Sequence, residues 1–304
     1  MTTTALGRFL DGDLWYSFRT SPVAIGAALV AFACVFVAAF ADFVAPYNPF
    51  DLATLELADS RLPPAWIEGG GPKYLLGTDD QGRDILSALM YGARISLLVG
   101  AASVLLSVLV GVSLGLLAGF VGGNTDAFIM RICDVMLSFP PILIALLVSG
   151  VGRAMFPSAH ETLAFAVLVL AIAIPGWVQY ARTVRGSTMV ERGKEYVQAA
   201  RVIGVSRLRI MRKHVLPNVL GPVLVLATIH VAVAIITEAT LSFLGVGVPP
   251  TEPSLGTLIR VGNDFLFSGE WWITIFPGVM LVLIALSVNL LGDWLRDALN
   301  PRLR

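Results

Sequence analysis

The chain has 304 residues, of which 56% are hydrophobic and 14% are charged, and its mean hydropathy is +0.80. An ordinary soluble domain carries about 25% charged residues, so this composition excludes a soluble globular protein and predicts several membrane-spanning helices. The formal net charge is zero, and the two cysteines, Cys34 and Cys133, lack the spacing of a disulfide framework or a metal site.

The first predicted span follows a polar, mildly basic segment that contains Arg8 and Arg19. Residues 23–41 carry no charge and are about long enough to cross a bilayer, which takes roughly 20 residues. Ala39-Phe40-Ala41 is similar to a signal-peptidase site, but the apolar run is longer than the roughly 7 to 15 residues of a cleaved signal peptide. We therefore expect an uncleaved transmembrane helix.

A long polar segment, residues 42–94, separates this span from the next one. We expect part of it to fold, because an unstructured connection of about fifty residues is uncommon. Residues 76–84 predict a turn, followed by a helix that contains Leu86, Leu89 and Met90. The acidic residues of the turn lack the spacing and the terminal Glu of a calcium-binding EF-hand loop, so no metal site is predicted there.

Three apolar runs predict the next spans, at residues 95–124, 135–152 and 162–181. The first run has glycines at Gly-x-x-x-Gly spacing, which lets helices pack closely in lipid. These are Gly111, Gly115 and Gly119. The second run is broken by Pro140-Pro141 and the third contains Pro175, and a membrane helix tolerates proline where its neighbours satisfy the freed backbone groups.

The longest polar interruption in the second half of the chain is residues 194–218. Four of its residues recur at i, i+3, i+4 and i+7 and therefore share one face of a predicted helix. They are Tyr196, Ala199, Ala200 and Ile203. Gly204 interrupts this helix, where Gly costs about 1 kcal/mol relative to Ala, and Pro217 suits the first turn of the next span. A basic loop that only sets topology would explain the charge but not the small-residue face or the glycine.

The last two spans are predicted at residues 217–244 and 271–292. The first of these carries Glu238, and a carboxylate within a span is costly and usually faces the bundle interior or a water-filled cavity. A structural contact between helices is the preferred interpretation of Glu238, and a contact on a translocation pathway is the alternative. His230, in the same span, is interpreted as a packing residue rather than a proton carrier.

The distribution of charge predicts the orientation. With six spans and the N-terminus inside, 15 of the 21 basic residues are cytoplasmic, and nine of them lie between Arg182 and Lys213. Basic residues near span ends favour the cytoplasmic side, so this topology is preferred over its mirror image. Both termini and residues 182–216 are then cytoplasmic, and residues 46–90 and 246–270 are external.

The polar loop resembles the E-A-A loop of bacterial ABC importer permeases, in which Glu-Ala-Ala is followed after three residues by Gly and after nine more by Ile-x-Leu-Pro. At this spacing the chain has Gln198-Ala199-Ala200, then Gly204, then His214-Val215-Leu216-Pro217. Gln replaces the usual Glu, and His replaces the usual Ile. Three further stretches resemble the C-type subunits of dipeptide and oligopeptide permeases, so the resemblance covers most of the chain. They are residues 76–97, 238–245 and 293–302.

The resemblance implies an all-α, polytopic membrane protein with six transmembrane helices and the type I ABC importer permease fold. It implies a division into residues 1–94, with the first transmembrane helix and the external loop, and residues 95–304, a five-helix core with the coupling loop 182–216. It also implies transport of di- or oligopeptides across the bacterial cytoplasmic membrane, through a coupling helix that docks on an ATPase. The residues assigned to coupling are Tyr196, Gln198, Ala199, Ala200, Ile203, Gly204 and Pro217.

The implied partners are a second permease subunit in a heterodimer, two ABC ATPase subunits that bind ATP and Mg, and an extracytoplasmic substrate-binding protein. Nucleic acid is not expected as a partner. The chain itself has no G-x-x-x-x-G-K-[ST] loop, so we expect neither a bound cofactor nor enzymatic activity. The alternative is a self-sufficient secondary transporter that uses Glu238, although the spans hold few other carboxylates and no inverted repeat is evident.

Overall fold

The fold is described from a computed structural model, over residues 13–51, 55–155, 160–249, 251 and 253–299. Every regular element in these ranges is a helix, and the one pairing of extended backbone is an isolated bridge between Thr78 and Asp84. The predicted all-α class is confirmed. The expectations that rest on Arg8 and on residues 300–304 lie outside the described residues.

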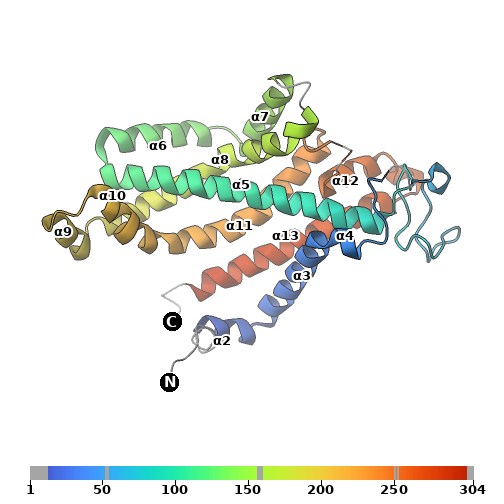
Figure 1. Cartoon of the computed structure of the whole chain (residues 1–304), viewed down its shortest axis with the longest axis horizontal. Helices are drawn as coiled ribbons and strands as arrows, with labels where there is room; N and C mark the ends of the chain where they lie inside the picture. The colour runs from blue at the N-terminus through green and yellow to red at the C-terminus, as the bar shows by residue number, and fades with distance from the viewer. Residues whose placement is uncertain (1–12, 52–54, 156–159, 250, 252, 300–304) are drawn as a thin grey trace.

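Five helices in the described part of the chain are long and apolar enough to cross a membrane (Figure 1). They are α3 (Pro22–Ala39), α5 (Ile85–Val121), α8 (His160–Glu191), α11 (Leu216–Phe243) and α13 (Trp272–Ala298). The shorter helices are α2 (Asp13–Thr20), α4 (Ala41–Val44), α6 (Gly123–Leu137), α7 (Pro141–Met155), α9 (Glu195–Val202), α10 (Arg207–Ile210) and α12 (Leu255–Asn263). There are also two 3-10 turns, η1 (Leu57–Asp59) and η4 (Leu266–Ser268), and a π-helical turn, η3 (Met211–Val215).

The third span, predicted over residues 135–152 with a break at Pro140-Pro141, is indeed broken there. Helices α6 and α7 meet at a bend of 91°, so together they form at most one broken span. The bend lies at the predicted prolines, because Pro140 precedes another proline and is thereby disfavoured in the α conformation. Pro141 then begins α7, a position that suits its fixed φ and missing N–H. If this pair counts as one span, the described part of the chain has six candidate spans.

The contacts between spans fix the direction of each helix. Gly111 faces Tyr180 and Gly119 faces Thr188, so α5 and α8 run parallel, and α6 with α7 must return the chain between them. Gly100 faces Ile235 and Gly292 faces Thr228, and the other spans alternate in direction around α5. The loop of α9 and α10 therefore lies at one end of the molecule, and α12 lies at the opposite end (Figure 1).

The glycine stripe of α5 sets its distance from α8. A Cβ atom added to Gly111 would lie 2.5 Å from the carbonyl oxygen of Trp177, and one added to Gly119 would lie 2.8 Å from that of Arg185. Gly115 meets the backbone of Ala181 in the same way. No side chain fits at these contacts, so the glycines serve close helix packing, as their spacing predicts.

Helix α5 begins as the sequence predicts, in a turn that ends at Asp84. The Asp84 carboxylate accepts the N–H of Ser87 at 2.8 Å and so caps the helix. From there α5 runs unbroken for 37 residues, about 55 Å at 1.5 Å per residue, and is longer than the roughly 30 Å hydrocarbon core. The expected boundary between residues 1–94 and 95–304 falls inside α5, so no change of secondary structure marks it.

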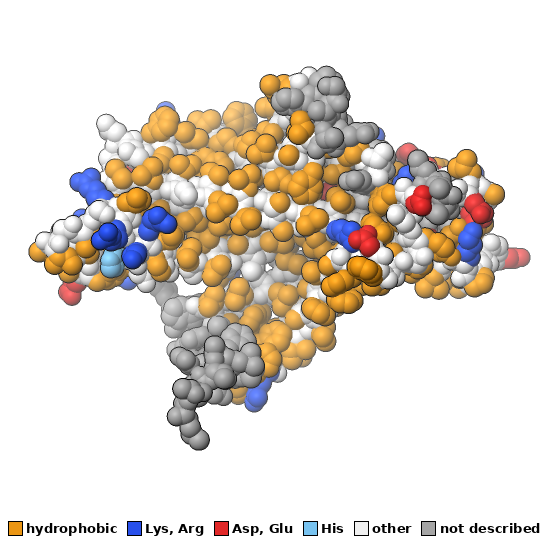
Figure 2. All heavy atoms as spheres, in the orientation of Figure 1, with side chains coloured by type: hydrophobic (Ala, Val, Ile, Leu, Met, Phe, Trp, Pro, Cys, Tyr) orange, Lys and Arg blue, Asp and Glu red, His pale blue; other side chains and the backbone are white. Residues whose placement is uncertain are grey.

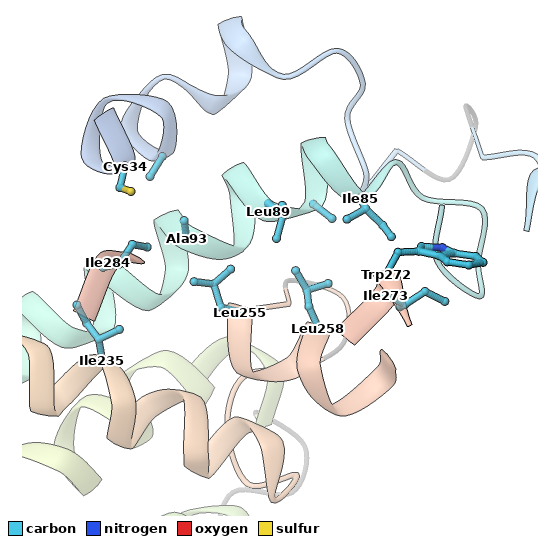
Figure 3. Close-up of a cluster of buried hydrophobic side chains, with 12 residues drawn as sticks. Cys34, Ile85, Leu89, Ala93, Ile235, Leu255, Leu258, Trp272, Ile273 and Ile284 are labelled. Atoms are coloured by element: carbon cyan, nitrogen blue, oxygen red, sulfur yellow. The ribbon is translucent and has the colours of Figure 1, made fainter. Parts of the chain in front are cut away.

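The end of the molecule opposite α9 has its own apolar core (Figure 3). Leu255 and Leu258 of α12 pack against Leu89 of α5, next to Trp272 at the start of α13. The Trp272 indole N–H also donates to the carbonyl oxygen of Thr78 at 3.2 Å. These contacts hold the turn before α5 against the last span.

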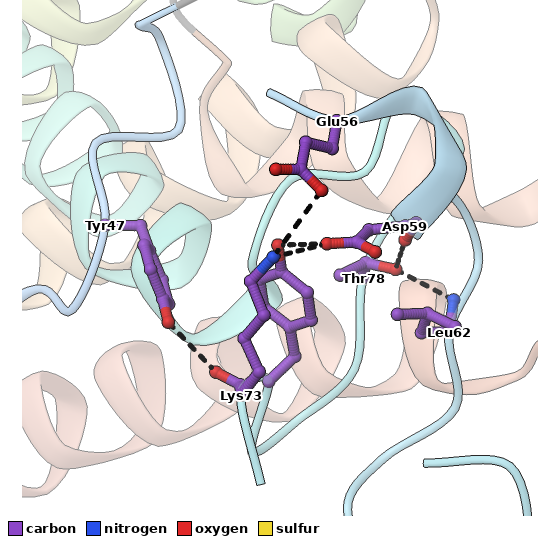
Figure 4. A network of polar contacts seen from close by, with 7 residues as sticks. Tyr47, Glu56, Asp59, Leu62, Lys73 and Thr78 are labelled. Carbon is purple, nitrogen blue, oxygen red and sulfur yellow. Dashed lines mark hydrogen bonds and ion pairs between the residues drawn. The ribbon is translucent and has the colours of Figure 1, made fainter. Parts of the chain in front are cut away.

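The long polar segment is folded at this end, as expected (Figure 4). The Asp59 carboxylate accepts hydrogen bonds from Lys73 Nζ at 2.6 Å and from the Tyr74 hydroxyl at 2.8 Å. The hydrogen bond from Lys73, followed by that from Tyr74, holds the pKa of Asp59 below its usual value. The Thr78 hydroxyl donates to the Asp59 carbonyl at 2.6 Å and accepts the N–H of Leu62 at 2.8 Å. Residues that are distant in sequence are therefore tied into one unit.

Candidate functional site

The polar loop forms α9, and Gly204 ends this helix. Gly204 has φ +79°, in the left-handed region that favours glycine. Its N–H donates to the Arg201 carbonyl at 3.1 Å, and the N–H of Val205 donates to the Ala200 carbonyl at 3.0 Å. These two bonds form a Schellman motif, which satisfies the last carbonyls of the helix and reverses the chain. The predicted interruption at Gly204 is confirmed.

The four residues of the predicted face of α9 are not all exposed. Ala200 is buried with Val197 in a core cluster that also contains Ile210 and Val219, whereas Tyr196, Ala199 and Ile203 are exposed. The difference follows from the angle of about 100° between consecutive helix residues. This chain itself covers Ala200, which packs α9 onto the helices behind it, so Ala200 is not available as an exposed contact.

Three large apolar side chains at the end of α9 and the start of α10 are exposed instead, and we call them the apolar patch. Val202 is 86% exposed, Ile203 is 78% exposed and Leu208 is 64% exposed. Covering each such side chain in a partner groove would contribute about 1.5–3 kcal/mol. Of the three, sequence reasoning identified only Ile203, because Val202 and Leu208 lie outside the i, i+3, i+4, i+7 pattern.

Tyr196 joins α9 to both neighbouring membrane helices. Its hydroxyl donates to the Glu191 carboxylate at the end of α8 and accepts from Asn218 Nδ2 of α11 at 3.0 Å. Lys194 Nζ lies 2.6 Å from the other oxygen of Glu191. Partial burial and the Glu191 carboxylate raise the pKa of the Tyr196 phenol, so its proton is retained at neutral pH. A displacement of α9 therefore acts on α8 and α11 together.

Pro217 lies in the first turn of α11, as predicted, but α11 is continuous with the helical turns before it. The helix restarts at Arg207, and α10, the π-helical turn and α11 form one continuous helical rod of 37 residues, Arg207–Phe243. In the π-helical turn, the Leu216 N–H donates to the Met211 carbonyl, five residues back. This wider turn lies just before Pro217, whose ring clashes with the carbonyl at i−4 in a regular α-helix. The predicted link from the loop to the fifth span is thus direct and stiff.

Glu238 is fully buried between three helices. Its two carboxylate oxygens accept hydrogen bonds from Ser96 of α5 at 2.6 Å and from Ser242 of α11 at 2.7 Å. The Ser96 hydroxyl also accepts the N–H of Leu255, the first residue of α12, at 3.3 Å. This arrangement agrees with the structural interpretation, because both oxygens of Glu238 are occupied by neighbouring helices.

A cavity of about 330 Å³ lies elsewhere among the spans, between α5, α7, α8 and α11. Its polar lining consists of Ser103, Ser107, Gln179, His230 and Thr237. His230 Nε2 lies 3.1 Å from Gln179 Oε1, and the imidazole packs edge-on against Tyr180, as expected for a packing residue. The polar residues that interrupt otherwise apolar spans were the available sequence signal for Ser103, Ser107 and Gln179, which our sequence analysis did not identify.

Charge is segregated on the surface (Figure 2). Hydrophobic side chains cover the middle of the face shown, and Lys and Arg side chains gather over α9 and α10. This distribution suits a molecule whose middle lies in lipid and whose loop of α9 and α10 lies in water.

Two comparisons with known sequences agree with this architecture. Residues 111–304 match the family described as "Binding-protein-dependent transport system inner membrane component", and residues 12–64 match the "N-terminal TM domain of oligopeptide transport permease C". The chain is 41% identical to the di/tripeptide transport system permease protein DppC of Pseudomonas aeruginosa (strain UCBPP-PA14), over 96% of this chain and 92% of that protein. It is 42% identical to the dipeptide transport system permease protein DppC of Escherichia coli (strain K12), over 96% of this chain and 93% of that protein.

Solved structures share the fold. The chain matches one from an inward-facing conformation of the MetNI methionine ABC transporter with a TM-score of 0.55, over 70% of this chain and 96% of that chain. The sequences are 19% identical, so this likeness concerns the fold alone. The length of the family match and the identity to the DppC proteins decide the family. The chain therefore belongs to the binding-protein-dependent transport system inner membrane components, with the permease fold of the type I ABC importers.

Proposed function

We propose that this chain is a permease subunit of an ATP-driven importer that moves di- or oligopeptides across the bacterial cytoplasmic membrane. The substrate class rests on the relatives, which are named as di/tripeptide and dipeptide permeases. The mechanism rests on one observation above all: the apolar patch of Val202, Ile203 and Leu208 is exposed at the water-facing end of a rod that enters the membrane.

In this proposal the apolar patch docks in a groove of a cytoplasmic ABC ATPase, which holds ATP and Mg. Gln198 and Ala199 lie on the exposed side of α9 and join the docking surface, whereas Ala200 supports it from behind. Movement of the ATPase displaces α9, and the Tyr196 network and the Arg207–Phe243 rod carry that movement to α8 and α11.

The proposal places the other partners at the side of the helical bundle and at the end opposite α9. A second permease subunit completes the pathway as a heterodimer, and an extracytoplasmic binding protein delivers the peptide at the end that carries Asp59 and α12. The cavity lined by Gln179 and His230 opens between the spans, and it supplies neutral hydrogen-bonding groups for a peptide in transit. The proposal also assigns both termini to the cytoplasm.

The test is a pair of charge insertions on the same helix. Ile203→Glu places a carboxylate in the apolar patch without disturbing a buried contact, since Ile203 is 78% exposed. We expect the complex that contains this variant to lose its ATPases on purification and to lose peptide uptake by about tenfold or more, because an unpaired charge buried at an interface costs several kcal/mol.

The matched control is Gln198→Glu, which adds the same charge to the docking surface at the one position where related permeases carry Glu, so the groove of the ATPase should accept it. This variant should retain its ATPases and its uptake. Normal uptake and normal ATPase retention by Ile203→Glu, at equal abundance in the membrane, would show that the apolar patch is not the coupling surface.

A further inference from the structure

A cavity of about 690 Å³ lies at the base of the coupling loop, between the ends of α5 and α8 and the helices α9 and α10. It is separate from the apolar patch, since Val202, Ile203 and Leu208 do not line it. Three arginines from different parts of the loop line it instead. They are Arg192, Arg201 and Arg207.

Two of these arginines have contacts that hold them in place. Arg192 Nη1 donates to the Gly119 carbonyl at 2.8 Å, at the end of α5, and the Arg201 guanidinium lies 5.3 Å from the centre of the Phe120 ring. Within the part of the chain that the structure describes, none of the three forms an ion pair with a carboxylate. Nearby cations do form such pairs: Arg182 with Asp134, Arg185 with Asp126 and Lys194 with Glu191.

Apart from Gly193 and Gln198, the rest of the wall is apolar, and part of it comes from the ends of two spans. Val121, the last residue of α5, and Met189, in the last turn of α8, both line the cavity, and they are 48% and 41% exposed. A molecule that fills this site would therefore place an anion among the arginines and a hydrocarbon group against the span ends.

We propose that this cavity binds the phosphate headgroup of an anionic phospholipid from the inner leaflet. Guanidinium groups bind phosphate through charge-assisted, often bidentate hydrogen bonds, and basic pockets between transmembrane helices on the cytoplasmic side suit anionic headgroups. The acyl chains follow Val121 and Met189 into the bilayer. The site lies beside α9, so the bound lipid braces the coupling helix at the membrane edge. This inference does not depend on the substrate of the transporter.

The experiment uses native mass spectrometry of the complete purified complex with added phosphatidylglycerol. The test variant is Arg201→Gln with Arg207→Gln, which leaves the contact of Arg192 with α5 intact. Each basic residue near a membrane surface contributes about fivefold to the binding of an anionic lipid, so we expect the double variant to bind phosphatidylglycerol about 25-fold more weakly. The two single variants should each show about a fivefold loss.

The matched control is Arg209→Gln with Arg212→Gln, which removes two exposed charges from the same loop but none from the cavity wall. The control should bind phosphatidylglycerol like the unaltered complex, and phosphatidylcholine should not compete with it. Equal loss in test and control variants, equal binding of phosphatidylcholine, or retention of inorganic phosphate in place of lipid would overturn the proposal. The proposal would also be overturned if only the test variant loses its ATPases while lipid binding is unchanged, because the arginines would then contact an acidic surface of the ATPase.

Discussion

At the scale of single residues, the surroundings of a polar group decide its role more than its type does. Glu238 has the residue type expected on an ion pathway, yet Ser96 and Ser242 occupy both of its oxygens. Gln179 and His230 are weaker signals in the sequence, yet both line a cavity among the spans. A carboxylate in a membrane span therefore need not lie on the transport route.

We predict that Glu238→Gln keeps most of the ATP-driven uptake, whereas Glu238→Leu loses folded protein. A serine hydroxyl both donates and accepts, so Ser96 and Ser242 can bond the introduced amide as they bond the carboxylate. Leucine offers them no partner, and each unsatisfied buried group costs roughly 1–3 kcal/mol. Uptake in vesicles and thermal stability in detergent measure the two effects. If Glu238→Gln instead abolished a proton-dependent, ATP-independent uptake, Glu238 would belong to a secondary transporter.

At the scale of elements, α9 shows that two residues of the same type can differ in burial because their side chains point in different directions. Ala199 is exposed and the adjacent Ala200 is buried against Val197 and Ile210. Gly204 ends the helix in its left-handed conformation, and the rod from Arg207 to Phe243 begins shortly after it. The short helix is thus held by its packing, by its C-terminal cap and by the network of Tyr196.

We predict different failures for the two alanines. Ala200→Glu should lower the yield of folded subunit, because overpacking alone costs about 1–3 kcal/mol and the buried carboxylate has no partner there. Ala199→Glu should fold normally and weaken the attachment of the ATPases. Size-exclusion chromatography of each subunit fused to a fluorescent protein measures the first effect, and co-purification measures the second. Equal yields of well-folded subunit for both variants would contradict the burial of Ala200.

At the scale of the whole molecule, the alternating spans separate two chemically different ends. One end carries α9, α10 and the three arginines of the cavity, and the other carries α12 and the hydrogen-bonded unit around Asp59 and Lys73. A transporter driven from one side and supplied from the other requires such a division. The structure places these two ends opposite each other. The excess of basic residues predicts which end is cytoplasmic.

We predict that a cysteine at position 68 is labelled by a membrane-impermeant thiol reagent in intact cells and that one at position 206 is not. Glu68 and Ser206 are both exposed, so Glu68→Cys and Ser206→Cys should leave the fold unchanged. The natural cysteines, Cys34 and Cys133, are buried and should give little background. Position 206 should become reactive once the membrane is permeabilised. Labelling of position 206 but not of position 68 in intact cells would invert the topology.

The sequence by itself determined the features that local chemistry controls. Runs of apolar residues predicted where the spans lie, since hydrocarbon excludes charge over a fixed length. The spacing of Gly111, Gly115 and Gly119 predicted close packing, and Gly204 predicted the end of α9. Asp84 lies in the predicted turn that precedes α5. Each of these features depends on neighbouring residues along one helix or one turn.

The tertiary structure alone decided the features that depend on contacts across the chain. The prolines between α6 and α7 were visible in the sequence, but the angle of 91° between the two helices is seen only in the structure. The burial of Ala200 is set by the helices behind α9, which a helical pattern does not specify. The cavity lined by Arg192, Arg201 and Arg207 forms because the ends of α5 and α8 meet α9 and α10 in space. The physical reason is the same throughout: periodicity identifies the faces of a helix, and only its neighbours determine which face is covered.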